Sequence, residues 1–595
     1  MSEEFFNWQM TCDRFAQEGD VRGIRACAAE VRALAAPGAA AEADAMEAEA
    51  ALYAGDAETA ERLARSAVER DAHHFRGNLM LAGALGAQFK LVEELPLLAT
   101  LTHELEAALL PGRSAPRHAD EKAQEAWARH LRQFLFRARG FEADAAYLAA
   151  DPERAAEALH HASALAPDIG TAANLYSKHL FMKNYRTQAA EQKRHDAEMF
   201  GEFFQGVQPY RHDRVQRLPE KRLRIGYLSR DFRLHAMAYF MPAFLRDFDP
   251  EHFSVYVYAS GPVDDVTRRF QRYHVQWRDF RGRSAHTAAR IIGEDQIDIL
   301  VDLSGHSQDN ALPVMAFHPA PITLTGLGYV ATTGLRAIDG VLVDHVTMPR
   351  VADETAFVER PVHLPSLFCY QPGAVREMPA VSGWSPYARN NYVTFGCFNN
   401  LAKLSDETLL CWRAILDRVP RSRLVFKGKM LSVPDGRSLF TERLQSLQFP
   451  IERTELRPFS EQYLEEYADI DIALDPSPYT GGLTTCEALY MGVPVVTLRG
   501  RTHGSRFGAS ILTAAGLTEL IAENEMEYVK IATALARHPE HLALNRQRLR
   551  THLEASLLMD GKRYMRGVES VYRELWRMFC LYGESWSIKK SSKKQ

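Results

Sequence analysis

The segment from residue 473 to residue 501 constrains the fold of this chain more than any other. Its sequence is ALDPSPYTGGLTTCEALYMGVPVVTLRGR. A short apolar run ends at Asp475, turn-forming residues follow it, and Thr484 and Thr485 stand where a helix should begin. A second apolar run, PVVTL, closes the segment. The order of strand, glycine-rich turn, helix and strand predicts half of a βαβ unit, with the turn at the carboxyl end of the first strand.

The turn in this segment has the features of an anion site. Free backbone N–H groups at the start of a helix, with two hydroxyl groups beside them, can bind an anion, and the helix dipole favours negative charge there. The segment has neither the lysine of a Walker A loop nor a GxGxxG motif, so P-loop and ordinary dinucleotide chemistry do not fit. A nucleotide-sugar pyrophosphate fits. A purely structural turn is the alternative, and this segment alone leaves both open.

Composition and length narrow the class of protein. A single hydrophobic core does not normally extend over 595 residues, so we expect more than one domain. A formal net charge of −5 gives no electrostatic reason to expect a nucleic-acid partner. The first 15 residues are acidic and no later run is long enough to cross a bilayer, so we expect neither a secretory signal nor a membrane span. The 7 cysteines are scattered without CxxC spacing, which indicates a cytoplasmic protein with no structural zinc.

Residues 1–205 are predicted to be all-helical, because alanine is abundant and apolar residues recur at intervals of three and four. Two stretches, 54–71 and 149–168, resemble each other and look like tetratricopeptide hairpins. The matching positions are Asp56 with Asp151, Ala60 with Ala155, and Ala67 with Ala162. Stacked helix pairs of this kind usually hold a peptide or a partner on a concave surface. A helical bundle that only supports the rest of the chain is the alternative.

The pattern changes after residue 205. Residues 206–222 are polar and contain proline, which indicates a linker. Buried strands then alternate with helices over residues 223–375, and the alternation restarts over residues 390–560. This predicts two doubly wound parallel sheets. Two such domains in tandem bring the carboxyl ends of their strands together across a cleft, where ligands bind.

The carboxyl end of the chain is predicted to form one more helix. Apolar residues recur at helical spacing through residues 564–582 and give an amphipathic stripe. We expect a helix over residues 561–586 that packs across both sheet domains. The basic residues 587–595 are expected to be disordered.

Five stretches, taken together, resemble the glycosyltransferase family of the protein O-GlcNAc transferases and SPINDLY-type proteins. They are GYLSRDFRLHA, DILVDLSGHS, HPAPITLTGLGYVATTG, FGCFNNLAKLSDETLLCW and DIALDPSPYTGGLTTCEALYMGVPVVTLRGRTHGSRFGAS. The similarity covers residues 225–520. It implies an α/β protein with the GT-B fold, in which two Rossmann-like domains face a cleft, preceded by an all-α tetratricopeptide-like domain. The first sheet domain would form the acceptor side and the second the donor side.

The resemblance also implies an activity. Family members transfer a sugar with inversion and without a metal, from a nucleotide sugar to serine or threonine hydroxyls of proteins, and no separate cofactor is expected. UDP-GlcNAc is the favoured donor, and a protein acceptor held partly by the N-terminal helices is the expected partner. The alternatives are an O-fucosyl- or N-glycosyltransferase of the same fold that uses another nucleotide sugar, and a non-catalytic helical-repeat adaptor.

Three residues match catalytic positions of the family. Lys403 would pair with the pyrophosphate, because the leaving nucleoside diphosphate gains negative charge that must be neutralised without a metal. His235 matches an active-site histidine near donor and acceptor, which either orients one of them or acts as the base. His306 follows a strand in the DLSGH motif and is the third expected catalytic residue.

The donor site is expected to be lined by residues of the same motifs, and these are Asn400, Tyr463, Gly482, Leu483, Thr484 and Thr485. The sequence departs from the animal-type enzymes at three of them. Asn400 falls where O-GlcNAc transferases carry glutamine, and Leu483 falls where they carry histidine. Tyr463 stands where the family often has a histidine against the nucleotide base, and a tyrosine ring can still stack on a base.

Overall fold

The computed structural model describes residues 3–34, 36–110, 121–349 and 354–584. The chain divides into two units. The first comprises Met1–Met182 together with Met430–Arg443, and the second comprises Lys183–Lys429 together with Leu444–Gln595. No helix among the described residues is long and apolar enough to cross a membrane.

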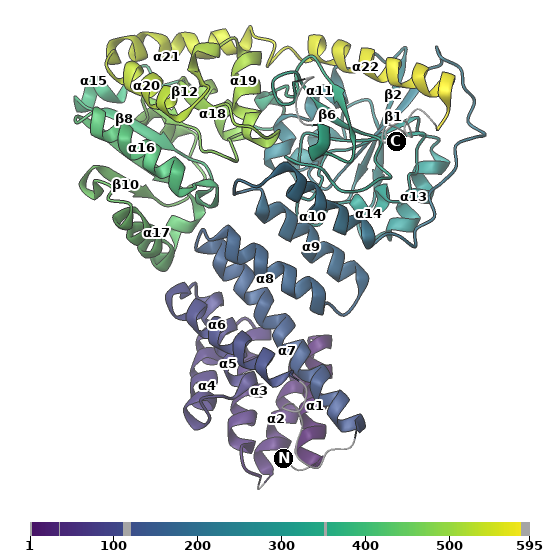
Figure 1. The fold of residues 1–595 in the computed structure, drawn as a ribbon, viewed down its shortest axis with the longest axis vertical. Helices are drawn as coiled ribbons and strands as arrows, with labels where there is room; N and C mark the ends of the chain where they lie inside the picture. The colour runs from purple at the N-terminus through teal and green to yellow at the C-terminus, as the bar shows by residue number, and fades with distance from the viewer. Residues whose placement is uncertain (1–2, 35, 111–120, 350–353, 585–595) are drawn as a thin grey trace. The chain divides into compact units, whose positions relative to one another are not determined.

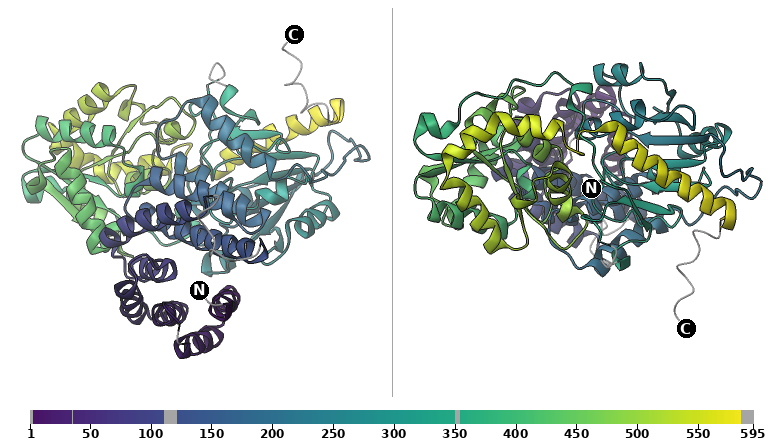
Figure 2. Two further views of the ribbon diagram at one scale, coloured as in Figure 1. Left: turned by 60° about the horizontal axis from the view of Figure 1, so that its bottom comes forward. Right: turned by 90° about the horizontal axis from the view of Figure 1, so that it is seen from above.

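The first unit is built from antiparallel helix pairs (Figure 2). Its helices are α1 (Glu3–Glu18), α2 (Val21–Ala33), α3 (Ala39–Tyr53), α4 (Ala57–Arg70), α5 (Phe75–Ala87), α6 (Leu91–Ala108), α7 (Glu121–Leu148), α8 (Pro152–Leu165) and most of α9 (Ile169–Lys183). The two similar stretches occupy equivalent places, because Asp56 caps α4 and Asp151 caps α8. The four matched alanines are all fully buried. The repeat predicted from the sequence is therefore a structural repeat.

A buried ion cluster joins three helices of this unit. The side chain of Arg76 on α5 is 1% exposed. It donates hydrogen bonds to Asp13 on α1 and to Glu42 and Glu49 on α3. Opposite charges so deeply buried are tolerated only when each is paired, which fixes the relative positions of the three helices.

Part of the first unit comes from far along the sequence. Residues 430–443 include the first turns of α17 (Pro434–Ser446). The Val92 backbone N–H donates a hydrogen bond of 3.0 Å to Asp435 Oδ2, and Leu439 packs on the apolar cluster of α5, α6 and α7. No local pattern predicts that this segment joins the first unit, because its partners lie hundreds of residues away in the sequence.

The second unit contains two parallel sheets (Figure 1). The first lobe has strand order β3-β2-β1-β4-β5-β6-β7. Its strands are β1 (Leu223–Ser229), β2 (Phe253–Ala259), β3 (Gln276–Asp279), β4 (Ile299–Asp302), β5 (Ile322–Thr325), β6 (Gly340–Val343) and β7 (Arg360–His363), and its helices are η1 (Ala236–Tyr239), α11 (Pro242–Arg246), α12 (Asp265–Phe270), α13 (Ala285–Glu294) and α14 (Leu312–Met315).

The second lobe has strand order β10-β9-β8-β11-β12-β13. Its strands are β8 (Val393–Cys397), β9 (Ser422–Lys427), β10 (Thr454–Arg457), β11 (Ile472–Leu474), β12 (Val495–Leu498) and β13 (Ile521–Ala522), and its helices are α15 (Pro386–Asn390), η4 (Leu401–Lys403), α16 (Asp406–Arg418), α18 (Leu483–Tyr490), α19 (Phe507–Ala515), α20 (Glu525–Ala536) and α21 (Pro539–Glu554). Two parallel sheets with crossover helices confirm the GT-B arrangement that the alternation of strands and helices predicts.

The boundary between the helical part and the sheets differs from the one expected near residue 205. Helix α10 (Ala190–Glu202) belongs to the second unit, because its Phe200 is buried and packs edge-on against His306 with ring centroids 4.5 Å apart. Residues 206–222, expected to be a linker, also lie against the first lobe. The Tyr210 N–H donates to Phe317 O, and His212 is buried with a hydrogen bond to His318 O.

The C-terminal helix α22 (Gly561–Tyr582) forms as expected and lies along the first lobe (Figure 1). Trp576 is fully buried, donates a hydrogen bond of 2.9 Å to Leu218 O and has the Lys221 ammonium over its ring. The crossing from the second lobe is made by residues 555–560 before the helix, where the Tyr370 N–H bonds to Leu558 O. The packing described here is against the first lobe, and packing of the helix on the second lobe remains a prediction. Residues 585–595, and with them the expected disordered tail, lie outside the described residues.

Replacing Trp576 with alanine should destabilise the second unit by about 3–5 kcal/mol, because a large buried side chain and its indole hydrogen bond are lost. The matched control is Leu581→Ala, since Leu581 lies on the same helix and is 74% exposed. Thermal unfolding followed by circular dichroism measures both variants. An unchanged melting temperature for Trp576→Ala would contradict the packing of α22 described above.

Candidate functional site

Lys403 lies at the end of the short turn η4, directly after β8. Its ammonium donates hydrogen bonds of 3.2 Å to Thr480 O and 3.4 Å to Asn399 Oδ1. The ammonium also lies 4.3 Å from the centroid of the Tyr479 ring. Burial lowers the pKa of Lys403 to about 8, although Asp475 and Cys397 nearby favour the charged form. A cation that is held in place but poorly solvated is suited to pair with an anion.

The amino end of α18 lies beside this lysine. Thr484 Oγ1 donates a hydrogen bond of 2.9 Å to Asn399 Oδ1, the same oxygen that Lys403 contacts. The hydroxyl of Thr485 is buried and has no hydrogen-bond partner among the described residues. The first backbone N–H groups of a helix also lack intrahelical acceptors. Donors and positive charge therefore gather around Asn399, as an anion requires.

Gly481 lets the chain pass between these groups. A β-carbon at this position would lie 2.5 Å from Thr485 Oγ1, 2.7 Å from Thr484 Oγ1 and 2.8 Å from Asp475 Oδ1. Any side chain would therefore push the two hydroxyls away from the end of the helix. The glycine-rich turn singled out in the sequence has a steric reason at this residue.

Asp475 holds the glycine-rich loop in place through hydrogen bonds. Its carboxylate accepts hydrogen bonds from the Gly481 N–H at 2.6 Å and from Thr497 Oγ1 at 2.7 Å. Burial raises the pKa of Asp475 to about 6. At neutral pH the carboxylate is charged and attracts Lys403, so it keeps that ammonium protonated without forming a direct ion pair.

Tyr463 contacts α18 further along the helix, at Glu487. Its hydroxyl donates a hydrogen bond of 2.5 Å to Glu487 on α18. Burial raises the pKa of Glu487 to about 8, against the opposing effects of the Tyr463 hydrogen bond and the nearby Arg376 charge. The expected position of Tyr463 near the donor site is compatible with this contact. The sequence analysis did not name Glu487 or Arg376, because a glutamate inside a helix and an arginine in a loop carry no motif of their own.

The other expected donor-binding residues take different positions. Asn400 is exposed, and its side chain accepts a hydrogen bond from the Ala402 N–H. Its neighbour Asn399 makes the contacts to Lys403 and Thr484. Gly482 precedes the first residue of α18, and Leu483 packs on the central apolar core. Donor contacts by Asn400, Gly482 and Leu483 remain predictions.

His235 stands where the first lobe meets the second. It caps η1, and η1 packs against α18. Its Nδ1 lies 3.4 Å from Asp231 Oδ2 and accepts a hydrogen bond from the Met237 N–H. Burial, together with the charges of Arg233 and Arg230, lowers the pKa of His235 against the opposing effect of Asp231. The imidazole is therefore neutral at pH 7 and able to accept a proton.

His306 has a different environment. Its side chain is completely buried, and its Nε2 is 2.9 Å from Thr333 O. The ring packs edge-on against Phe200 and Tyr329. Burial lowers its pKa to about 4. These contacts indicate a packing role, and catalysis by His306 remains a prediction.

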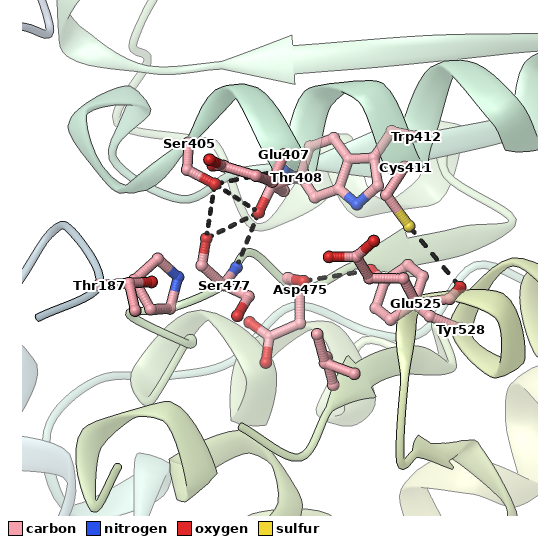
Figure 3. Close-up of a pocket in the computed structure, with 12 residues that line it drawn as sticks. Thr187, Ser405, Glu407, Thr408, Cys411, Trp412, Asp475, Ser477, Glu525 and Tyr528 are labelled. Atoms are coloured by element: carbon pink, nitrogen blue, oxygen red, sulfur yellow. Dashed lines mark hydrogen bonds between the residues drawn. The ribbon is translucent and has the colours of Figure 1, made fainter. Parts of the chain in front are cut away.

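A cavity of about 300 Å³ adjoins the loop that follows β11 (Figure 3). Its walls hold that loop in position, because Ser405 Oγ and Thr408 Oγ1 both donate to Ser477 O. Tyr528 donates a further hydrogen bond of 3.1 Å to Asp475 O. The residues that line this cavity therefore fix the backbone from which Asp475 and Gly481 reach the site.

The pKa of Lys403 predicts how anion binding depends on pH. The ammonium attracts a diphosphate only when protonated, so affinity should be full below pH 7 and fall as the pH rises through about 8. Between pH 7 and pH 9 the charged fraction falls roughly tenfold, and affinity for a nucleoside diphosphate should fall by up to that factor. Isothermal titration at several pH values measures this. The control is Lys403→Ala, for which the same decline should be absent; an equal decline would assign the effect to another group.

Comparison with known proteins agrees with this geometry. The sequence profile of glycosyl transferase family 41 matches residues 182–378 and 374–568, and it begins where the second unit begins. The probable UDP-N-acetylglucosamine–peptide N-acetylglucosaminyltransferase SPINDLY of Solanum lycopersicum is 38% identical over 422 residues, which are 68% of this chain and 44% of the relative. The protein of the same name from Oryza sativa subsp. japonica is 40% identical over 378 residues, which are 61% of this chain and 40% of the relative.

A solved structure is also similar. It is a lysine-to-methionine mutant of the O-GlcNAc transferase of Thermobaculum terrenum, with 29% sequence identity and a TM-score of 0.71. The similarity covers 92% of this chain and 99% of that one. The matched part spans less than half the length of the curated plant relatives. The extent of the profile match nevertheless settles the family: this chain belongs to glycosyl transferase family 41.

Proposed function

We propose that this protein is an inverting, metal-independent glycosyltransferase that moves a sugar from a nucleotide sugar to serine or threonine hydroxyls of proteins. The observation that carries the proposal is the meeting of the Lys403 ammonium and the Thr484 hydroxyl at Asn399, at the amino end of α18. A pyrophosphate bound there would receive hydrogen bonds from a cation, hydroxyls and helix N–H groups at once.

In the proposed reaction the glycosidic bond to the diphosphate breaks while an acceptor hydroxyl attacks from the opposite face of the sugar. Negative charge grows on the leaving diphosphate as the bond breaks. Lys403 and the amino end of α18 stabilise that charge more in the transition state than in the bound donor, and this difference accelerates the step. Asp475 contributes indirectly, because it keeps Lys403 protonated.

The described residues around this site do not include a cluster of carboxylate or imidazole groups of the kind that binds a divalent metal. Among the described residues, two groups could hold a metal ion, and they are His538 with Glu540 and His541, and Asp249 with Glu251 and His252. Neither group contains a residue of the site. Mg²⁺ prefers several oxygen ligands, whereas Lys403 and the helix end supply donors of hydrogen bonds. The cationic lysine takes the place that a metal would have.

His235 is proposed to serve the acceptor. It is neutral at pH 7, it lies at the junction of the two lobes, and its Nδ1 is 3.4 Å from Asp231 Oδ2. Such a histidine either takes the proton of the attacking hydroxyl or orients that hydroxyl. Both roles place His235 on the acceptor side and Lys403 on the donor side.

The nucleoside is proposed to lie against Tyr463 and Glu487. The tyrosine ring offers a surface for a base, and the carboxyl group of Glu487 can form hydrogen bonds with sugar hydroxyls. UDP-GlcNAc is the favoured donor, supported by the names of the plant relatives. A GDP-sugar is the second candidate.

The cysteines bear on the compartment in which the protein works. All 7 of them are free thiols, which supports a reducing compartment such as the cytoplasm.

Replacing Lys403 with alanine should lower turnover about 10²–10³-fold, the cost of losing one charge-stabilising donor in the transition state. Turnover is measured as release of UDP or GDP from the nucleotide sugar, in the presence of a chelator. Lys530→Ala is the matched control, because Lys530 is exposed on α20 of the same lobe. Full turnover by a folded Lys403→Ala protein would remove this lysine from the mechanism, and loss of wild-type turnover in chelator would refute the metal-free reaction.

The helical first unit is proposed to hold the protein acceptor. A chain shortened to begin at residue 169 keeps α9, α10 and the whole second unit, and it should retain donor binding and slow donor hydrolysis. It should lose most transfer to protein, because remote binding energy contributes to turnover as well as affinity. A chain beginning near residue 217 is unsuitable, since it lacks α10 and the Phe200–His306 contact.

Radiolabelled transfer to protein and to a short peptide, compared with donor hydrolysis, tests this proposal. Selection by the helices predicts that transfer to protein falls while hydrolysis persists. Undiminished transfer to protein by the shortened chain would show that the helices do not select the acceptor.

A further inference from the structure

Three consecutive residues between α9 and α10 each contact a different part of the second unit. Asn184 Nδ2 donates a hydrogen bond of 3.0 Å to the Tyr329 hydroxyl in the first lobe. Tyr185 stacks on Tyr479 in the second lobe, with ring centroids 5.2 Å apart and planes inclined by 27°. These contacts place residues 184–186 against both lobes at once.

The third residue, Arg186, acts on the turn that carries Lys403. Its Nη1 donates a hydrogen bond of 3.2 Å to Ala402 O. Ala402 immediately precedes Lys403, and both belong to η4. The backbone on the amino side of Lys403 is therefore tied to residues 184–186, and Thr187 next to them lines the cavity of Figure 3.

Tyr185 acts on Lys403 through the intervening ring of Tyr479. The Tyr479 ring has Tyr185 stacked on it and also carries the Lys403 ammonium at 4.3 Å. Tyr185 is 4% exposed, so it covers Tyr479 with a buried surface. An aromatic ring held by a second ring cannot swing freely, and it offers the ammonium a fixed surface from which water is excluded.

Removal of Tyr185 would leave Tyr479 uncovered, and the ammonium would gain water and freedom of movement. The hydrogen bonds of Lys403 to Thr480 O and Asn399 Oδ1 would remain. The ammonium would therefore stay near these two oxygens, but its position would be less restricted. Misplacement of a catalytic group by about 1 Å can reduce a rate by roughly 10²-fold. The stack is thus placed to affect the rate.

We propose that Tyr185 is a positioning residue for sugar transfer, which holds the Tyr479 ring beneath the Lys403 ammonium and so fixes the ammonium against the donor diphosphate. This rests on the proposed function. It also gives the segment after the N-terminal helices a part in the chemistry of the donor lobe. Ordinary packing is the alternative: the stack would then stabilise the second unit without affecting Lys403.

The test compares Tyr185→Ala with Tyr185→Phe, which keeps the ring and removes only the hydroxyl. Tyr185→Ala should lower kcat for release of the nucleoside diphosphate about 10–100-fold, with a smaller change in KM, and Tyr185→Phe should restore it. Tyr392→Ala is the matched control. Tyr392 also has a cation over its ring, Arg423 at 5.0 Å, but it lies at the amino end of β8, and its loss should leave kcat unchanged.

A second measurement follows Lys403 itself and does not need activity. The lysines are ¹³C-methylated, and the Lys403 signal is identified by its absence in Lys403→Arg. Asp475 and Cys397 are the titratable groups that face this ammonium, and neither is altered by Tyr185→Ala. Since burial is the main cause that lowers the pKa of Lys403 to about 8, that pKa should rise in Tyr185→Ala and stay near its original value in Tyr185→Phe and Tyr392→Ala.

The outcomes separate this inference from the proposed function. A fall in kcat together with a shifted Lys403 titration supports the inference. Wild-type kcat in Tyr185→Ala overturns it, whether or not the titration moves, and so does a titration that stays unchanged. If the wild-type protein released no nucleoside diphosphate from any nucleotide sugar, the proposed function would fail, and the titration alone would then decide whether Tyr185 fixes Lys403.

Discussion

The rest of the site depends on the contacts that hold the Lys403 ammonium in place. A half-buried lysine loses part of its hydration, and here three neighbours compensate: the Thr480 carbonyl, the Asn399 amide oxygen and the Tyr479 ring. The lysine follows β8, whereas Thr480 and Tyr479 follow β11, its neighbour in the sheet. Two strand ends side by side in a parallel sheet thus create the place where a diphosphate can be held.

Buried polar contacts keep this arrangement rigid. Asp475 is bonded to the Gly481 N–H and to Thr497, and Tyr528 bonds to the Asp475 carbonyl. Each of these groups would be costly to bury without its partner, so the loop is held in one conformation before any ligand arrives. An anion site built this way loses little free energy to reorganisation during the reaction, which is the advantage of electrostatic catalysis in a preorganised site.

The sequence predicted those features that depend on local patterns. The glycine-rich turn before α18, the alternation of strands and helices, and the repeated capping residues Asp56 and Asp151 were all recognisable. Features that depend on long-range packing were not. Helix α10 resembles another repeat helix in sequence, and its long-range contacts place it with the sheets, among them Phe200 with His306 and Arg336 with Glu198. The contact with Phe200 also explains why a histidine in a promising motif is buried.

The difference between Asn399 and Asn400 has a similar cause. Two adjacent asparagines follow β8, and in an extended chain adjacent side chains point in opposite directions. The sequence could not decide which of them faces Lys403, and the resemblance to the family implied only that Asn400 contacts the donor. In the structure Asn400 caps η4 and Asn399 contacts the lysine. Glu487 was missed because its partner Tyr463 is 24 residues away.

A crystal structure of the full-length protein with UDP or GDP, grown in the presence of a chelator, tests the central claim most directly. The account predicts the terminal phosphates within hydrogen-bonding distance of Lys403 Nζ and Thr484 Oγ1, with the base near Tyr463. Nucleotide bound in the cavity lined by Trp412 and Tyr528, or bound only when a metal ion is added, would contradict it.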